Sequence, residues 1–580
     1  MQTICAMARM NPRKTNGITQ SSSRSTWMRK PFSDQQRLDC DAINNVKLNL
    51  NCRDEIIPIL VALQHIYSSA SVREPILRLI AEDVNRDSRR DIGREGFDDW
   101  QILVLAAVRL GCNLDYDKLQ DLAEQHRALR HTMGIGDWDD ETSFNWRRIQ
   151  STLLLLKPET IEKINHLIVA EGHAIDPDAR KKVRADSFVV ETNIHYPTES
   201  SLILDGITKI LALCVVLSAQ FDVSGWRQHE HLLKKIKNIA ITISRMSSGK
   251  SPKSEERIKI QYRKLLKRSL KILRRAEELL NQVADQEADV VTLCNIMDLK
   301  RFIELTQQVC STAHRRVNEG ETVPNSDKIF SIFETHTQLY RRGKAGQPNQ
   351  FGRLVMVYED AAGFISHYFM MPRDAQDADV VVEQTRIVQD RHHNEIEDAS
   401  FDRGFDSPEN EEQLRTIIEH PCLPKKAPSK FQEQTKNASI RFRDARQRHP
   451  GIESAIGALQ SGNALDRCRD RTEIGFERYL ALGILGRNLH VLGKILIQQT
   501  APDAKAAESL RPDQRNPHSW SSVAYQPIVL CADGALVRLK QPTIALQRDL
   551  GEYGGHLQPL ILTLRNLIQR KMSISGRTLG

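Results

Sequence analysis

Two acidic residues of this sequence stand where the neighbouring pattern predicts strands. Asp186 lies in the alternating run "RADSFVVE", and Asp402 follows a short apolar run and opens "DRGFDSPEN". An aspartate followed by glycine can simply make a turn. It can also hold a metal ion on a rigid support, beside a turn that Gly404 permits.

A mixed sheet can bring these carboxylates together. If the two strands are neighbours, Asp186 and Asp402 face one another across a few ångströms. Their mutual repulsion would be removed by divalent cations. Glu453 is the candidate third ligand, because Pro450 favours a helix start and places Glu453 in the first turn. Oxygen ligands of this kind suit two Mg²⁺ or Mn²⁺ ions, which support phosphoryl transfer.

Other metal and acid candidates are weaker. Asp205 is the main rival of Asp186, but it follows an apolar run of helical type. His392 and His393 lack a third ligand at a suitable spacing. The ten cysteines show no zinc-ligand spacing, which favours reduced thiols in a cytosol.

Positive charge is concentrated in one block. Residues 226–280 hold 16 Lys and Arg against 5 Glu, an excess of +11 that exceeds the +8 of the whole chain. Such a block indicates a phosphate backbone as partner, although a solvated coiled-coil arm would have the same pattern. The candidate DNA-binding residues here are Lys234, Lys235, Arg263, Lys264, Lys267, Arg268 and Lys271.

The wider pattern predicts a multidomain α+β protein. A chain of 580 residues is too long for one ordinary core. Apolar spacing predicts helices at 54–67, 98–112 and 115–134. The short "CNLD" link between the last two fits either a DNA-reading helix-turn-helix or an ordinary hairpin.

The second half mixes strands and helices. A strand at 184–191 and an apolar helix at 201–221 precede two basic helices that break at 247–254. Strands follow at 328–334, 351–360 and 363–371, the last two as a hairpin. A helix at 377–390, the strand into Asp402 and a helix from 407 complete the order. The apolar run 210–221 is too short to span a bilayer, and the first 25 residues lack the apolar core of a signal peptide.

Several segments together resemble the DDE transposases of bacterial insertion sequences, specifically the ISNCY-type group. They are "GFDDWQILVLAAVRLGCNLDYDKLQDLAEQHRALRHTMG", "DSFVVETNIHYPTESS", "ASFDRGFDSPEN" and "IESAIGALQSGNALDRC" with "GFERYLALGILGRNLHVLG". The resemblance spans about residues 30–495. It implies a metal-dependent enzyme that cuts DNA at the element's ends and joins the 3′-OH to target DNA. The alternatives are a catalytically decayed DNA-binding protein and an RNase H-like nuclease without strand transfer.

The resemblance also implies an architecture. It comprises an RNase H-like mixed-sheet core, interrupted by a basic helical insertion and preceded by a helical domain. We expect a disordered N-terminus (1–30), a helical DNA-binding domain (31–175), a split core (176–222 and 321–500), the insertion (223–320) and a C-terminal tail (501–580). Asp186, Asp402 and Glu453 would be the catalytic metal ligands, and Arg448 and His449 would contact DNA. The partners would be double-stranded DNA and a second copy in a dimer on DNA, with no membrane. The location would be the bacterial cytoplasm, at the nucleoid.

Overall fold

The computed structural model describes residues 38–85, 96–139, 142–247, 251–284, 286–341, 348–425 and 439–500 and two short strands further on. The chain forms two compact units, Met1–Pro502 and Asp503–Gly580. In the second unit, the described part is the antiparallel pair β8 (Ile528–Leu530) and β9 (Leu536–Arg538). The N-terminal segment 1–30 and the rest of the predicted tail lie outside the described residues.

The N-terminal part is helical, as predicted. Its helices are α2 (Ile56–Ser68), α3 (Ala70–Val84), α4 (Asp99–Gly111), α5 (Tyr116–Gln125), α6 (Arg127–Thr132), α7 (Trp146–Leu153) and α8 (Pro158–Ile175), after the 3₁₀ turn Ile43–Asn45. The single helix predicted at 115–134 is wrong. His126 ends α5 in an extended conformation, and its side chain accepts the Leu129 N–H to cap α6.

The helices α4 and α5 are joined by the predicted short link. Residues of α4 from Ile102 to Gly111 are buried throughout, so this helix packs as a core helix. The helix α5 carries three acidic residues, Asp117, Asp121 and Glu124, and one basic residue, Lys118. A helix with this excess of carboxylates would be repelled by DNA phosphates, which favours the ordinary hairpin over the DNA-reading motif.

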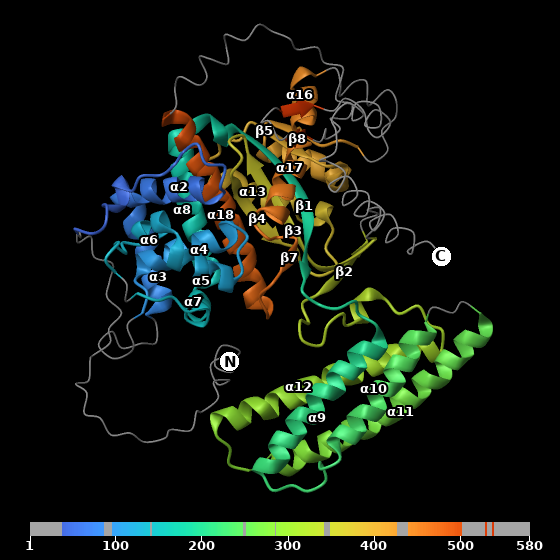
Figure 1. Ribbon diagram of the computed structural model, residues 1–580. Coiled ribbons are helices and arrows are strands. Elements are labelled where there is room, and N and C mark those ends of the chain that lie inside the picture. Colours follow the sequence, from blue (N-terminus) through green and yellow to red (C-terminus); the bar gives the residue numbers. More distant parts are fainter. Residues whose placement is uncertain are drawn as a thin grey trace, which may run out of the picture. The chain divides into compact units, whose positions relative to one another are not determined.

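A mixed sheet is the centre of the first unit (Figure 1). Its strands are β1 (Lys182–Thr192), β2 (Gln338–Arg341), β3 (Asn349–Asp360), β4 (Ile365–Met370), β5 (Asp398–Phe401), β6 (His420–Cys422) and β7 (Arg467–Cys468). The order is β2-β3-β1-β5-β6, with β4 also on β3 and β7 also on β1. The strands β1, β3 and β4 are antiparallel neighbours, whereas β5, β6 and β7 run parallel. The β3–β4 hairpin and the strand into Asp402 are confirmed.

The strand predicted at 328–334 is wrong, because the structure has its strand at Gln338–Arg341 instead. The apolar alternation of this segment has another cause. Ile332 packs into the core of the helical bundle described below, whereas the Phe330 ring lies 5.7 Å from the Phe351 ring of β3. The segment links two cores, so its apolar residues face two directions without pairing in the sheet.

Helices cover both faces of the sheet. Phe188 and Val190 of β1 share a core with α2, α4 and α8 and with α17 (Gly451–Ser461) and α18 (Glu473–Thr500). Ala185 and Val189 point to the other face, where α13 (Asp377–Arg391) and α14 (Pro408–Ile417) pack. The helix α16 (Ile440–Arg448) contacts β5 and β6. The predicted helices after 377 and 407 are confirmed.

The basic segment belongs to a four-helix bundle of α9 (Glu199–Gln220), α10 (His229–Met246), α11 (Pro252–Val283) and α12 (Val290–Ala313). The predicted break falls between α10 and α11 and is confirmed. The two helices do not stand alone, however, since α9 and α12 pack with them around one apolar core. The bundle therefore includes residues 199–220, which we had expected in the first part of the sheet core.

Two helices, α9 and α18, have the length and apolar composition of membrane spans. Of their most apolar windows, 56% and 67% are buried inside the fold. Burial of this extent is typical of core helices. The helix α9 begins before the apolar run 210–221, and Leu202, Ile203 and Ile207 in its earlier part are also buried. Cys214, Cys310, Cys422 and Cys468 are free and buried.

Candidate functional site

The parallel pairing of β1 with β5 brings the first two candidate acids together. Ala185 and Phe401 are the last paired residues, so Asp186 and Asp402 follow side by side. Ala185 and Phe401 point into the core under α13. Because side chains alternate along a strand, Asp186 and Asp402 point to the opposite face. The condition that the two strands are neighbours is therefore met.

The third candidate acid lies on a helix that packs on the same face. The helix α17 contacts β1, and Ile452, Ile456 and Leu459 bury one side of it in the core that also contains Phe188. Glu453 follows Ile452 in the first turn and is exposed. The sequence thus predicted both the start of this helix and its buried side correctly.

Arg184, which we did not select from the sequence, ties the end of α16, three residues before α17, to the sheet. Its Nε donates to Glu359 Oε2 at 2.5 Å, and its Nη1 donates to the carbonyl oxygen of Arg448 at 2.9 Å. Burial raises the pKa of Glu359, and the Arg184 guanidinium opposes this effect. A signal existed in the sequence, since Arg184 is two residues before Asp186 and therefore lies on the same face of the strand.

His449 lies close enough to two of the acids to feel their charges. Its Nδ1 is 3.1 Å from Oγ of Ser400, the residue two positions before Asp402. Burial lowers the pKa of the imidazole, the carboxylates of Asp402 and Glu453 raise it, and Arg184 lowers it further. The charges of two candidate acids thus act on one half-buried ring. The exposed Arg448 beside it lies 3.8 Å from Asp398.

Gly404 lies in a 3₁₀ turn, Arg403–Phe405, and the Asp402 carboxylate accepts the Arg403 N–H at 2.7 Å. Its φ is not in the left-handed region, and a Cβ there would meet Asp377 Oδ2 at 3.4 Å as its nearest atom. An alanine would fit, so this turn does not need the conformational freedom of glycine.

The rival acid and histidines have other surroundings. Asp205 lies on α9 of the bundle, 3.4 Å from His195, and burial raises its pKa. His392 is buried and lies 3.0 Å from the carbonyl oxygen of Arg180. In the part of the chain that the structure describes, no group of three or more His, Cys, Asp or Glu side chains is already gathered as a metal site. The donor chemistry of Asp186, Asp402 and Glu453 nevertheless suits a hard divalent cation.

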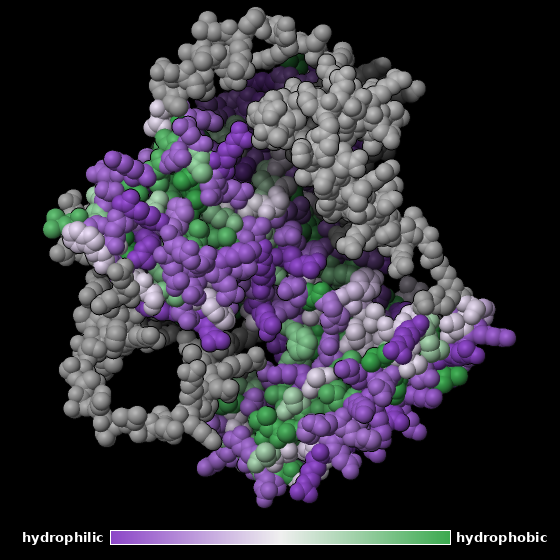
Figure 2. All heavy atoms as spheres, viewed as in Figure 1, coloured by the Kyte–Doolittle hydropathy of each residue, from purple (hydrophilic) through white to green (hydrophobic). Residues whose placement is uncertain are grey.

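The basic face of the bundle is exposed. All seven candidate side chains lie on its surface: Lys234, Lys235, Arg263, Lys264, Lys267, Arg268 and Lys271. Between residues 257 and 275, α11 carries nine Lys and Arg and no acidic residue. Figure 2 shows hydrophilic side chains gathered over this part of the bundle, while its buried side is apolar. An extended cationic face of this kind can follow a phosphate backbone.

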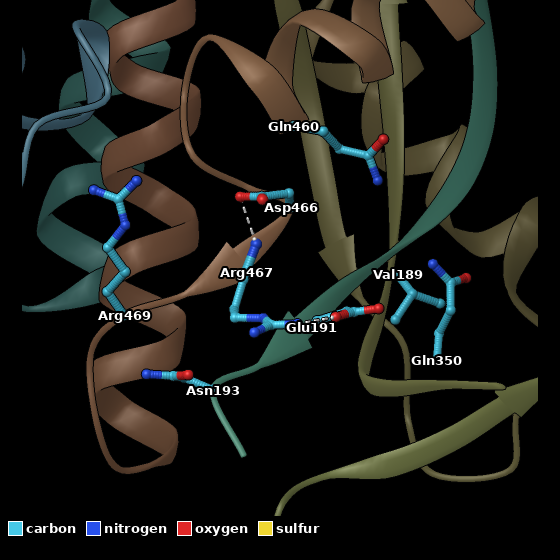
Figure 3. A pocket seen from close by; sticks show the side chains of 8 residues that line it. All are labelled: Val189, Glu191, Asn193, Gln350, Gln460, Asp466, Arg467 and Arg469. Carbon is cyan, nitrogen blue, oxygen red and sulfur yellow. Dashed lines mark hydrogen bonds and ion pairs between the residues drawn. The ribbon is translucent and has the colours of Figure 1, made fainter. Parts of the chain in front are cut away.

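A polar cleft lies farther along the same elements (Figure 3). It has a volume of about 600 Å³ at the carboxyl end of β1, and we did not predict it. Its lining combines residues of β1, β3, α17 and the segment that enters β7, which are far apart in the chain.

Comparison of the chain with protein-family models, with curated proteins and with solved structures gave no match.

Proposed function

We propose that this protein is a DDE-type DNA transposase with Asp186, Asp402 and Glu453 as its catalytic acids. The observation that carries the proposal is the pairing of β1 with β5, which sets Asp186 beside Asp402 on the face where α17 packs. Acids from segments more than 200 residues apart meet on rigid elements, as a catalytic site requires.

The sheet supports an RNase H-like core. A β1–β3–β4 antiparallel meander with β5 and β6 added in parallel beside β1 is the layout expected of such a core. The bundle α9–α12 is inserted between β1 and β2, where the resemblance places the helical insertion.

The chain's own residues would act as follows. Asp402 and Glu453 are exposed, so their side chains can turn toward a common point beside Asp186. Arg184 holds the end of α16 on β1 and would thereby set where α17 begins and where Glu453 lies. Two divalent cations bound to the three carboxylates would supply activation of the attacking oxygen and stabilisation of the leaving oxygen. The exposed Lys and Arg of α10 and α11 would hold the DNA, and a second copy would hold the other end.

The test is a divalent-ion-dependent assay of cleavage and joining. The substrate is a linear duplex that carries the sequence flanking the coding region, and supercoiled plasmid is the target. We expect nicking with Mg²⁺ or Mn²⁺ followed by joined products. Asp186→Asn should remove both reactions and retain DNA binding. The matched control is Asp205→Asn on α9, which should cut and join like wild type.

Three results would contradict parts of the proposal. Absence of nicking with both ions would favour a decayed DNA-binding protein. Nicking without joined products would favour a nuclease. Loss of nicking in Asp205→Asn but not in Asp186→Asn would show that the acid site is wrongly assigned.

A further inference from the structure

The polar cleft is built from side chains that both donate and accept hydrogen bonds. Apart from Val189, its lining is polar: Glu191, Asn193, Gln350, Gln460, Asp466, Arg467 and Arg469. The two acids balance the two arginines. Arg467 is held by Glu191, with 3.0 Å between Nη2 and Oε2, and Arg469 donates to Asn113. A bare phosphate would need an excess of free positive charge, so the lining suits a neutral polar ligand better.

One buried atom in the cleft lacks a partner. Gln350 is 9% exposed, and its Oε1 accepts no hydrogen bond from the residues that the structure describes. A buried carbonyl oxygen without a donor is unfavourable, and such groups are rare in folded proteins. A ligand with an N–H group in the cleft would satisfy it.

The cleft lies on the opposite face of β1 from Asp186, because Val189 and Glu191 point the other way, but it reaches the same open edge of the strand. Gln460 follows Glu453 by seven residues, two turns of α17, so both lie on one side of the helix about 10 Å apart. Along one edge of β1, the strand β5 pairs with residues up to Ala185. The strand β7 pairs with the same edge from Glu191 onward. Residues 186–190 between them have no described strand beside them there, so a polymer can pass over this edge from one face of β1 to the other.

We propose that this cleft holds the base of an unpaired nucleotide of the DNA strand whose phosphate lies at the acids. This inference rests on the proposed function. At about 3.4 Å per stacked nucleotide, a distance of about 10 Å places that base two or three nucleotides from the phosphate. The amides of Asn193, Gln350 and Gln460 match the edge of a base, which presents donors and acceptors together.

The test measures binding without divalent ions, so that it does not depend on cleavage. The probes are duplexes with a six-nucleotide single-stranded extension, at the 3′ or the 5′ end. The fluorescent base 2-aminopurine, or an abasic residue, stands at each extension position in turn. We expect one position to change its fluorescence on binding, and an abasic residue there to weaken binding about tenfold.

Amide removal should abolish this preference. Gln350→Ala and the partly exposed Gln460→Ala should bind the intact and abasic probes equally, and the second variant guards against misfolding of the first. The matched control is Gln413→Ala, an exposed amide on α14 outside the cleft, which should keep the tenfold difference.

The outcomes separate the two proposals. If the protein cuts DNA but no abasic position weakens binding, the cleft inference is overturned and the proposed function stands. If the tenfold difference is found without any metal-dependent cutting, the cleft inference stands and the proposed function fails. If the difference persists in both cleft variants, the base lies elsewhere and the inference is overturned. If no probe binds, both fail.

Discussion

The contact between Gly451 and Arg184 should control how α17 presents Glu453. A Cβ on residue 451 would lie 2.1 Å from Arg184 Nη1, whereas ordinary contact begins at 3.4 Å. The substitution Gly451→Ala must therefore shift the guanidinium or the helix by about 1.3 Å. Gly457, six residues later in the same helix, has no atom within 4 Å of such a Cβ. Gly457→Ala is the matched control.

The magnitude follows from the hydrogen bonds at stake. A shift of this size breaks the bond from Arg184 Nη1 to the Arg448 carbonyl oxygen, a charge-assisted bond that contributes about 1.5–3 kcal/mol. Alanine is favoured over glycine in a helix by about 1 kcal/mol, which offsets part of the loss. We expect Gly451→Ala to lower the free energy of unfolding by about 1 kcal/mol and Gly457→Ala to raise it by up to about 1 kcal/mol. A misplacement of about 1 Å at Glu453 should reduce the cleavage rate about 100-fold.

The assays are urea unfolding of both variants and Mg²⁺-dependent nicking of duplex DNA. Nicking should fall in Gly451→Ala and stay at the wild-type rate in Gly457→Ala, with equal DNA binding in both. If the two variants nick DNA equally, Arg184 does not set the position of Glu453 and the reasoning is refuted.

Three further predictions concern the acids, the basic face and pH. Asp402→Asn and Glu453→Gln should each reduce the cleavage rate at least about 1,000-fold. Their effects should not be additive, because the acids act as one unit that either substitution breaks. Asp406→Asn is the control, and cutting at the wild-type rate by Asp402→Asn would contradict the site. Replacement of Lys264, Lys267, Arg268 and Lys271 by Gln should weaken binding to all duplexes alike. The slope of log affinity against log salt concentration should fall in magnitude by up to about 3.6, at about 0.9 per contact. The control, Lys300→Gln with Arg301→Gln on α12, should leave this slope unchanged. A loss of binding that depends on DNA sequence would instead indicate groove contacts. Burial raises the pKa of Asp98, the N-cap of α4, from 3.8 to about 6. The folded state thus binds this proton more tightly, and its contribution to stability, present below pH 3.8, is lost as the pH rises through 6. Asp98→Asn keeps the cap but cannot titrate. Between pH 4 and 6, the free energy of unfolding of the variant, measured by urea titration, should therefore rise relative to that of wild type. Parallel pH curves for the two proteins would disprove that Asp98 causes the pH dependence.

Local patterns in the sequence determined most elements. Apolar spacing located α2, α4, α9 and α11, because a helix that buries one face must repeat its apolar residues every three to four positions. Alternation located β1, β3 and β4 for the corresponding reason in strands. The same rule failed at 328–334, where two cores, rather than the two faces of one strand, produced the alternation.

The candidate acids could be selected from their types and local settings, but their meeting could not be derived there. The chain separation between Asp186 and Asp402 carries no information on strand neighbours, and the pairing of β1 with β5 depends on the whole sheet. Packing likewise produces the bond from Arg184 to the end of α16, the influence of two acids on the His449 imidazole and the burial of Gln350 in its cleft. Side chains from distant segments share an environment only after the sheet has formed, so the sequence determined the elements and their chemistry, and the tertiary structure decided which of them act on one another.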